Sequence, residues 1–233
     1  MLIASLLLAA ASSAFVPENP ARVAEIAAML PEKPAMVDVK FRADGDAKDV
    51  KPAARLAASP VEAFPDDLYL EFSRNGNRTH YQDWRGRFLK SLETLASGEA
   101  AERKGRFVPA IAARLDAICT WPSWVLPAHD RSLGNFANTN VTVDLVSSDL
   151  ARTLARILGS VGDALPPETV RRVRNEVNRR VFTPYLERPQ AHWWFFGHNN
   201  WNAVCHCGCV IAALELIEDR TTRARFVEGA ERA

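Results

Sequence analysis

The chain lacks a strong charge of either sign, and it lacks long hydrophobic runs. Its 29 lysine and arginine residues nearly balance its 28 aspartate and glutamate residues, so the formal net charge is +1. Without a basic excess there is no field to attract a nucleic-acid backbone, and we expect no nucleic-acid partner. The apolar run at residues 2–11 is only about half the length of a membrane-spanning helix. The sequence therefore predicts no membrane span.

Strand-like alternation is also scarce, and helical periodicity replaces it from residue 81 onward. Apolar residues recur at spacings of three and four, which is the pattern of helices that bury one face. These stripes occupy residues 84–95, 107–118, 150–161 and 170–181, and further helices are expected over residues 210–217 and from residue 221. Loops of moderate length join them. The pattern predicts an all-α domain of antiparallel helix pairs.

The first 65 residues differ in composition from the rest. Residues 2–11 are apolar and lead to small residues ending at Ala14, as at a signal-peptidase site, although no Lys or Arg precedes them; a buried first helix is the alternative. Residues 15–65 hold seven prolines and one expected helix, over residues 21–30, with too little apolar content for a separate core. We predict a signal peptide at 1–14, an irregular segment wrapping the main body at 15–65, and a main domain at 66–233. The signal peptide implies a periplasmic or extracellular protein.

Residues 192–209 are the segment richest in chemically active side chains. These eighteen residues hold three each of tryptophan, histidine, asparagine and cysteine. Indole faces stack on sugar rings, and amides and imidazoles hydrogen-bond hydroxyl and carboxylate groups. A second loop with tryptophan and histidine, at residues 121–130, is expected on the same rim, since helix junctions cluster at the ends of a helical array. The sequence therefore predicts a carbohydrate-binding cleft.

Several sequence blocks resemble the heparinase II/III-like family of polysaccharide lyases. The most specific is Asn-Asn-Trp-Asn-Ala-Val-Cys, which begins at Asn199. Other blocks lie at residues 70–81, 118–130, 143–145 and 179–185, so that the resemblance spans residues 69–233. It implies an (α/α) toroid followed by a β-sandwich, and β-elimination on uronate polysaccharides such as heparin, heparan sulfate or alginate. In that chemistry a Tyr or His removes the uronate C5 proton, while an Asn, Glu or His hydrogen-bonds the carboxylate.

The resemblance also suggests roles for particular residues. Asn200, and next to it Asn199, are candidates to neutralise the substrate carboxylate, because amide donors stabilise developing charge; Asn199 is alternatively only a helix cap. His198 and His129 are candidates for acid–base roles, and His129 alternatively satisfies a buried backbone group. The candidates for sugar contact are Trp124, Trp193, Trp194, Trp201 and Arg131. The alternative for each tryptophan is that it is a core residue.

The chain departs from the family pattern in its tyrosines and in its missing β-sandwich. None of Tyr69, Tyr81 and Tyr185 matches the family's catalytic tyrosine, which lies in a later helix-pair loop. We therefore expect an incomplete toroid, the fragment of a secreted lyase whose partner is an anionic polysaccharide. The alternatives are a non-catalytic carbohydrate-binding remnant and a glycoside hydrolase on the same toroid. Hydrolysis requires two flanking carboxyl groups, and no evident pair occurs near the cluster.

The cysteines at 205, 207 and 209 with His206 give the one arrangement that suggests a metal. Their one-residue spacing is shorter than the usual two to four residues in zinc sites. Alternate helix residues also point about 200° apart, so they cannot share one tetrahedral centre. We predict no metal and no cofactor, with Cys119 and Cys205 as small buried residues. A disulfide from Cys119 in an exported protein, and the oligomeric state, stay open.

Overall fold

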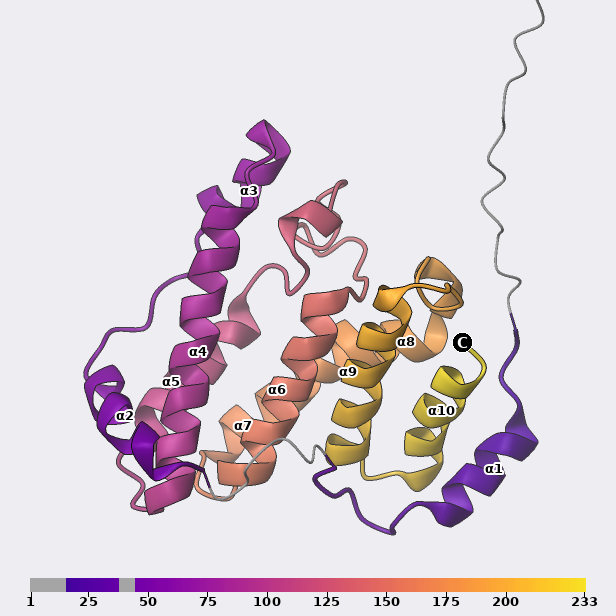
Figure 1. Cartoon of the computed structure of the whole chain (residues 1–233), viewed down its shortest axis with the longest axis horizontal. Helices are drawn as coiled ribbons and strands as arrows, with labels where there is room; N and C mark the ends of the chain where they lie inside the picture. Colours follow the sequence, from indigo (N-terminus) through magenta and orange to yellow (C-terminus); the bar gives the residue numbers. More distant parts are fainter. Residues whose placement is uncertain (1–15, 38–44) are drawn as a thin grey trace, which may run out of the picture.

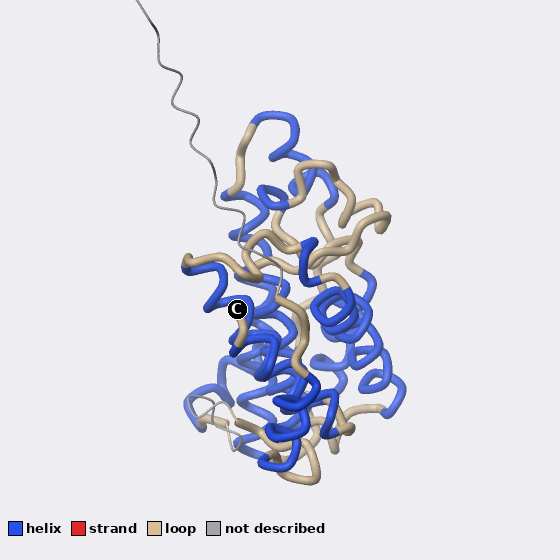
Figure 2. The backbone as a smooth tube through the Cα atoms, turned by 90° about the vertical axis from the view of Figure 1, so that its right-hand side faces the viewer, coloured by secondary structure: helices blue, strands red, loops and turns tan. Residues whose placement is uncertain are grey.

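The computed structural model describes residues 16–37 and 45–233, and throughout this part of the chain the regular elements are helices (Figures 1 and 2). The all-α prediction is confirmed. Within these residues no helix is long and apolar enough to cross a membrane. The predicted signal peptide, and most of an alternating run at residues 36–41, lie outside the described residues.

The helices of the main body form two layers, and the chain alternates between them. The front layer consists of α4 (Thr79–Glu102), α6 (Leu145–Val161) and α9 (Asn200–Leu216). The back layer consists of α5 (Val108–Thr120) and of α7 (Pro167–Val177) with its continuation η3 (Asn178–Phe182) and α8 (Thr183–Glu187). Helix α10 (Arg220–Glu231) packs on α9 at the right-hand edge of the molecule in Figure 1. Helix α6 packs against both α4 and α9, and α5 packs against α7. This order makes antiparallel helix pairs, as the sequence predicts.

The front helices all run in the same direction, downward in Figure 1, and the back helices return upward. The N-termini of α6 and α9 therefore lie at one end of the molecule. The loops 121–144 and 188–199 gather at that end, where Figure 2 shows most of the irregular backbone. Two short 3₁₀ turns, η2 (Pro127–His129) and η4 (Pro189–Ala191), lie within these loops.

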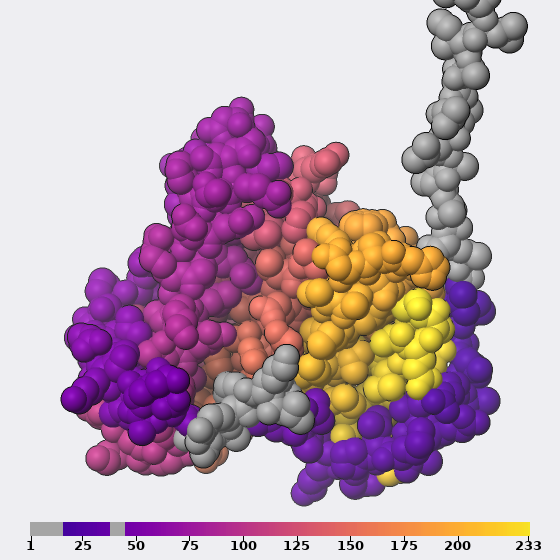
Figure 3. Space-filling view, viewed as in Figure 1, coloured from indigo at the N-terminus to yellow at the C-terminus, as the bar shows by residue number. Residues whose placement is uncertain are grey.

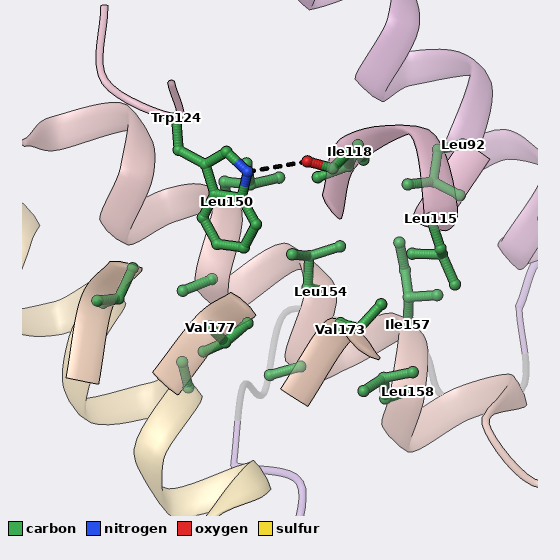
Figure 4. Packing of buried hydrophobic residues seen from close by; sticks show 14 of the residues in the cluster. Leu92, Leu115, Ile118, Trp124, Leu150, Leu154, Ile157, Leu158, Val173 and Val177 are labelled. Carbon is green, nitrogen blue, oxygen red and sulfur yellow. Dashed lines mark hydrogen bonds between the residues drawn. The ribbon is translucent and has the colours of Figure 1, made fainter. Parts of the chain in front are cut away.

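The core between the layers is built from the predicted apolar stripes (Figure 4). Leu150, Leu154 and Ile157 of α6 face Val173 and Val177 of α7, and all five are almost completely buried. Their spacings of three and four place them on one face of each helix. Helix α6 is therefore the central element of the fold, and the position of its N-terminus is determined by extensive packing.

The described parts of the N-terminal segment lie at the lower right and the lower left of the molecule, where they pack on α10 and on α4 (Figure 3). Helix α1 (Pro20–Met29) corresponds to the helix expected at residues 21–30, and it packs on α10. The buried Arg223 side chain donates hydrogen bonds to two backbone carbonyls that follow α1. Farther along, η1 (Ala47–Asp49) and α2 (Val50–Ala57) pack on α4. The sequence analysis missed α2, because Pro52 reads as a helix breaker; proline is tolerated in a first turn. Helix α3 (Asp66–Asn75) ends at Gly76, whose φ of 81° is a left-handed conformation that glycine adopts without strain.

Helices α6 and α9 approach closely at Gly208. A Cβ atom built there would lie 2.7 Å from the backbone carbon and oxygen of Ser148. Backbone cannot move as easily as the end of a side chain, so Gly208→Ala should shift the two helices apart. We expect a net loss of about 2 kcal/mol in unfolding free energy, although alanine itself favours a helix by about 1 kcal/mol. Urea denaturation measures it, and Cys207→Ala, at the exposed neighbouring position, is the control; equal stability of both variants would contradict the expectation.

Candidate functional site

The two loops that the sequence analysis placed on one rim do enclose a common cleft. The cleft has a volume of about 570 Å³ and lies between residues 128–144 and residues 191–201. In Figure 3 these segments, pink and orange, meet at the upper edge of the molecule. Of the residues predicted for the site, the cleft lining includes His129, Arg131, Trp193, Trp194 and Trp201.

Asp144 is the best-connected residue of the cleft. Its Oδ1 accepts hydrogen bonds from the backbone N–H groups of Val146 and Ser147, at 3.1 and 2.8 Å, as the N-cap of α6. Its Oδ2 accepts from the Leu126 N–H at 3.0 Å and from Nδ1 of His129 at 2.7 Å. The Ser147 hydroxyl accepts a return bond from the Asp144 N–H and completes a capping box. The sequence analysis missed this pairing, although the Asp-x-x-Ser spacing signals the capping box.

This bond sets the chemical state of the His129 ring. An ionised carboxylate only accepts hydrogen bonds, so Nδ1 of His129 carries the proton and donates it to Asp144. The second ring nitrogen, Nε2, then holds a lone pair in the neutral ring, and it makes no hydrogen bond to a described residue. A histidine oriented in this way by a carboxylate can accept a proton from a ligand. The partner of His129 is a side-chain carboxylate, so the alternative in which His129 only satisfies a backbone group does not apply.

Two tryptophans provide the apolar wall of the cleft. Trp193 is 63% exposed and lies with its ring centroid 5.0 Å from that of the half-buried Trp201. Trp201 also meets the His129 ring edge to face at a centroid distance of 4.5 Å. Ring faces that are accessible and rigidly held suit sugar stacking. The structure thus brings three predicted residues, from two loops, into one contiguous group.

His192 and Trp194 fix one loop to the other. Val143 donates its N–H to Nε2 of His192 at 3.0 Å, and its carbonyl accepts the Trp194 indole N–H at 2.9 Å. Nδ1 of His192 donates to the Arg188 carbonyl at 3.0 Å, so the ring is neutral and both nitrogens are satisfied. Burial lowers the pKa of His192 to about 4. The buried side chains of His192 and Trp194 therefore support the loop, and the exposed side chain of Trp193 between them borders the cleft.

Two of the predicted sugar platforms are core residues. Trp194 borders the cleft but is only 1% exposed, so its ring offers no face for stacking. Trp124 is 2% exposed; its indole N–H donates to the Ile118 carbonyl at 3.0 Å (Figure 4), and the Arg180 guanidinium lies over its ring. For these two residues the alternative reading, core packing, is the one that the structure supports.

Three further candidates, His198, Asn199 and Asn200, are exposed at the start of α9 and do not line the cleft. Asn199 is the N-cap of this helix, and its Oδ1 accepts the Trp201 N–H at 2.9 Å. Its neighbour Asn202, which the sequence analysis did not single out, donates to the carbonyls of Trp194 and Phe195. Asn199 therefore holds the start of α9 at Trp201, and Asn202 holds the backbone of Trp194 and Phe195 in place.

Asn199→Ala should cost about 1 kcal/mol of unfolding free energy, because it removes the cap of α9. Asn200→Ala, at the first helical position, should leave stability within about 0.5 kcal/mol. Thermal unfolding of the two variants measures the difference. A larger loss for Asn200 than for Asn199 would contradict the capping role.

The cysteines and tyrosines face the protein interior with one exception. Cys205 and Cys209 are buried while Cys207 between them is exposed, and none of the three is in a disulfide. Within the described residues no group of three or more His, Cys, Asp or Glu side chains is placed to hold a metal. His206 donates from Nε2 to the Phe195 carbonyl and accepts the Tyr185 hydroxyl at 2.7 Å. These contacts connect α8, α9 and the loop that contains Phe195.

The three tyrosines are all buried, and burial raises the pKa of each well above its usual value; they are Tyr69, Tyr81 and Tyr185. Tyr69 donates to Asp130, which also accepts the backbone N–H groups of Asn135 and Phe136 and so shapes the loop beside the cleft. No tyrosine hydroxyl is presented to the cleft.

No protein-family profile matches the chain, and no curated protein matches it significantly. The function of the protein is therefore inferred from the geometry of the cleft.

Proposed function

We propose that this chain carries the catalytic cleft of a secreted polysaccharide lyase that cleaves uronate polymers by β-elimination. The observation that carries the proposal is the His129–Asp144 pair in a cleft bordered by two accessible tryptophan rings and Arg131. The aromatic wall suits a sugar chain, and the cation suits its carboxylate. The alternation of α4 to α9 between two layers, with α10 returning antiparallel to α9, is compatible with an incomplete (α/α) toroid, which we propose as the architecture.

In the proposed reaction, Nε2 of His129 removes the C5 proton of the uronate. The electron pair of that C–H bond forms the C4–C5 double bond, and the C4–O bond to the neighbouring sugar breaks. The departing oxygen takes a proton, from the imidazolium or from water. Asp144 keeps His129 in the required tautomer and stabilises the imidazolium that forms. No described tyrosine competes for this role, since all three are buried.

Arg131 is the residue that we propose to offset the substrate carboxylate. It is exposed, and it lies two residues from His129 on the cleft wall. Removing the C5 proton places negative charge next to the carboxylate, which is costly unless a donor stabilises it. Asn200, Asn199 and His198 lie outside the lining, so we propose that they contact the next sugar along the rim.

Two alternatives are separable by their chemistry. A glycoside hydrolase needs two carboxyl groups across the scissile bond. Asp144 is the carboxyl group of the lining, and both its oxygens are already engaged by protein donors. A non-catalytic carbohydrate-binding protein would use the same aromatic wall, and it would bind without turnover.

The test is to incubate the protein with alginate, heparan sulfate and heparin and to follow ultraviolet absorbance. Elimination leaves a conjugated C4–C5 double bond that absorbs, whereas hydrolysis yields reducing ends without it. Absorbance that rises together with reducing ends supports the lyase. Reducing ends alone would identify a hydrolase, and calorimetric binding without either product would identify a binding protein. Export is tested separately, by sequencing the N-terminus of the mature protein, which we expect to begin at Phe15.

A further inference from the structure

We propose that the cleft selects uronate chains without sulfate, with one carboxylate per sugar as the only recurring charge. This inference rests on the proposed function, because it specifies the ligand of the same cleft. It follows from the charges that the cleft presents and from the charges nearby that are already engaged.

The charges of the lining are few and cancel. Arg131 contributes one positive charge and Asp144 one negative charge, and no lysine is present among the lining residues. The rest of the wall is neutral or apolar, with Thr142, Val143 and Ala191 facing the two tryptophans. A sulfated chain carries several anionic groups per disaccharide, and its sulfates would lose hydration here without gaining cationic partners.

The arginines closest to the cleft in sequence are not free to compensate. Arg188 donates to the side chain of Asn140 and to the Val141 carbonyl, which holds the loop next to the lining. Arg180 is buried, pairs with Glu176 and donates to the Trp121 carbonyl. Using either for a sulfate would break contacts that support the cleft walls. Arg131 is thus the cation available to a ligand in the lining.

The available cation and the stacking surface match a uronate. One guanidinium can pair with one carboxylate through two parallel hydrogen bonds. The exposed face of Trp193, next to Trp201, can cover the apolar face of a sugar ring. Binding would then depend more on stacking than on ion pairs, and it should change little with salt compared with a polyanion site.

Calorimetry with oligosaccharides of alginate and of heparin, equal in length, tests the inference. The His129→Gln variant of the full chain is used so that turnover is slow compared with the binding measurement. We expect alginate to bind at least about tenfold more tightly than heparin at physiological salt, a difference of one charged hydrogen-bond pair. Arg131→Gln should weaken alginate binding about tenfold, and Arg55→Gln, an exposed change on the distant helix α2, should leave it unchanged.

A gain-of-function variant completes the test. Ser132 is exposed on the cleft wall, and Ser132→Arg adds a second cation, which should strengthen heparin binding about tenfold. Heparin binding equal to or tighter than alginate binding in the unmodified cleft would overturn the inference, as would the absence of binding to both. If alginate binds selectively but the unsubstituted protein forms no elimination product, the charge inference stands and the lyase proposal is overturned.

Discussion

Replacing His129 with glutamine should lower kcat for β-elimination by about 10²- to 10⁴-fold, the usual contribution of a general base. Glutamine keeps a donor that can reach Asp144, but it has no group that accepts a proton near neutral pH. Because the change leaves the rings of Trp193 and Trp201 and the Arg131 side chain in the cleft, the Kd for an alginate oligosaccharide should stay within about threefold of the parent value. Initial rates of absorbance increase and calorimetry provide the two measurements.

The control for this experiment is Ser147→Ala. It removes the return bond of the α6 capping box and should cost about 1 kcal/mol of stability, yet it leaves the Asp144–His129 bond in place. Asp144→Asn is a poorer probe, because an amide nitrogen at the Oδ2 position would face the Leu126 N–H, whereas the flipped amide would place it at the Oδ1 position and remove the cap of α6. His129→Gln with undiminished kcat would remove His129 from the mechanism, and equal losses in both variants would assign its effect to folding.

The helical layout was predictable because it depends on local patterns. The apolar stripes of α4 to α7 place their residues on one face of each helix, and the structure buries those faces against each other. The turn at Gly76 and the cap at Asn199 follow from single residue types. The helix α2 was missed because Pro52 reads as a helix breaker, whereas in the structure it lies in the first turn, where proline is tolerated.

The candidate site was predictable as a region but not in its assignments. Trp193 and Trp194 are adjacent and chemically identical, yet the backbone turns one ring outward and the other onto Val143. That difference depends on a contact 51 residues away in sequence, and no local pattern encodes it. The same holds for Asp144 and His129, which are 15 residues apart and meet only because α6 begins beside the loop.

His192 should make the protein less stable in mild acid. In the folded state its pKa is about 4, lowered from 6.5 chiefly by burial. Protonation would also place an N–H at Nε2 against the Val143 N–H, which now donates to it. Between pH 6.5 and about 4 the unfolded chain therefore binds one proton that the native protein does not. Unfolding free energy should fall as pH decreases through this window, by at most roughly 3 kcal/mol from this one residue.

Urea denaturation at several pH values within this window measures the effect, and His192→Gln isolates it. Glutamine can accept the Val143 N–H and donate to the Arg188 carbonyl, but it does not titrate, so the stability of this variant should depend less steeply on pH. Burial also lowers the pKa of His206, and part of the acid sensitivity should remain until that residue is replaced too. The exposed His80 is the matched control, since His80→Gln leaves both buried rings in place. Identical pH dependence of the parent and His192→Gln proteins would show that His192 is not held neutral, and the support it gives to Val143 and the α6 cap would have to be reconsidered.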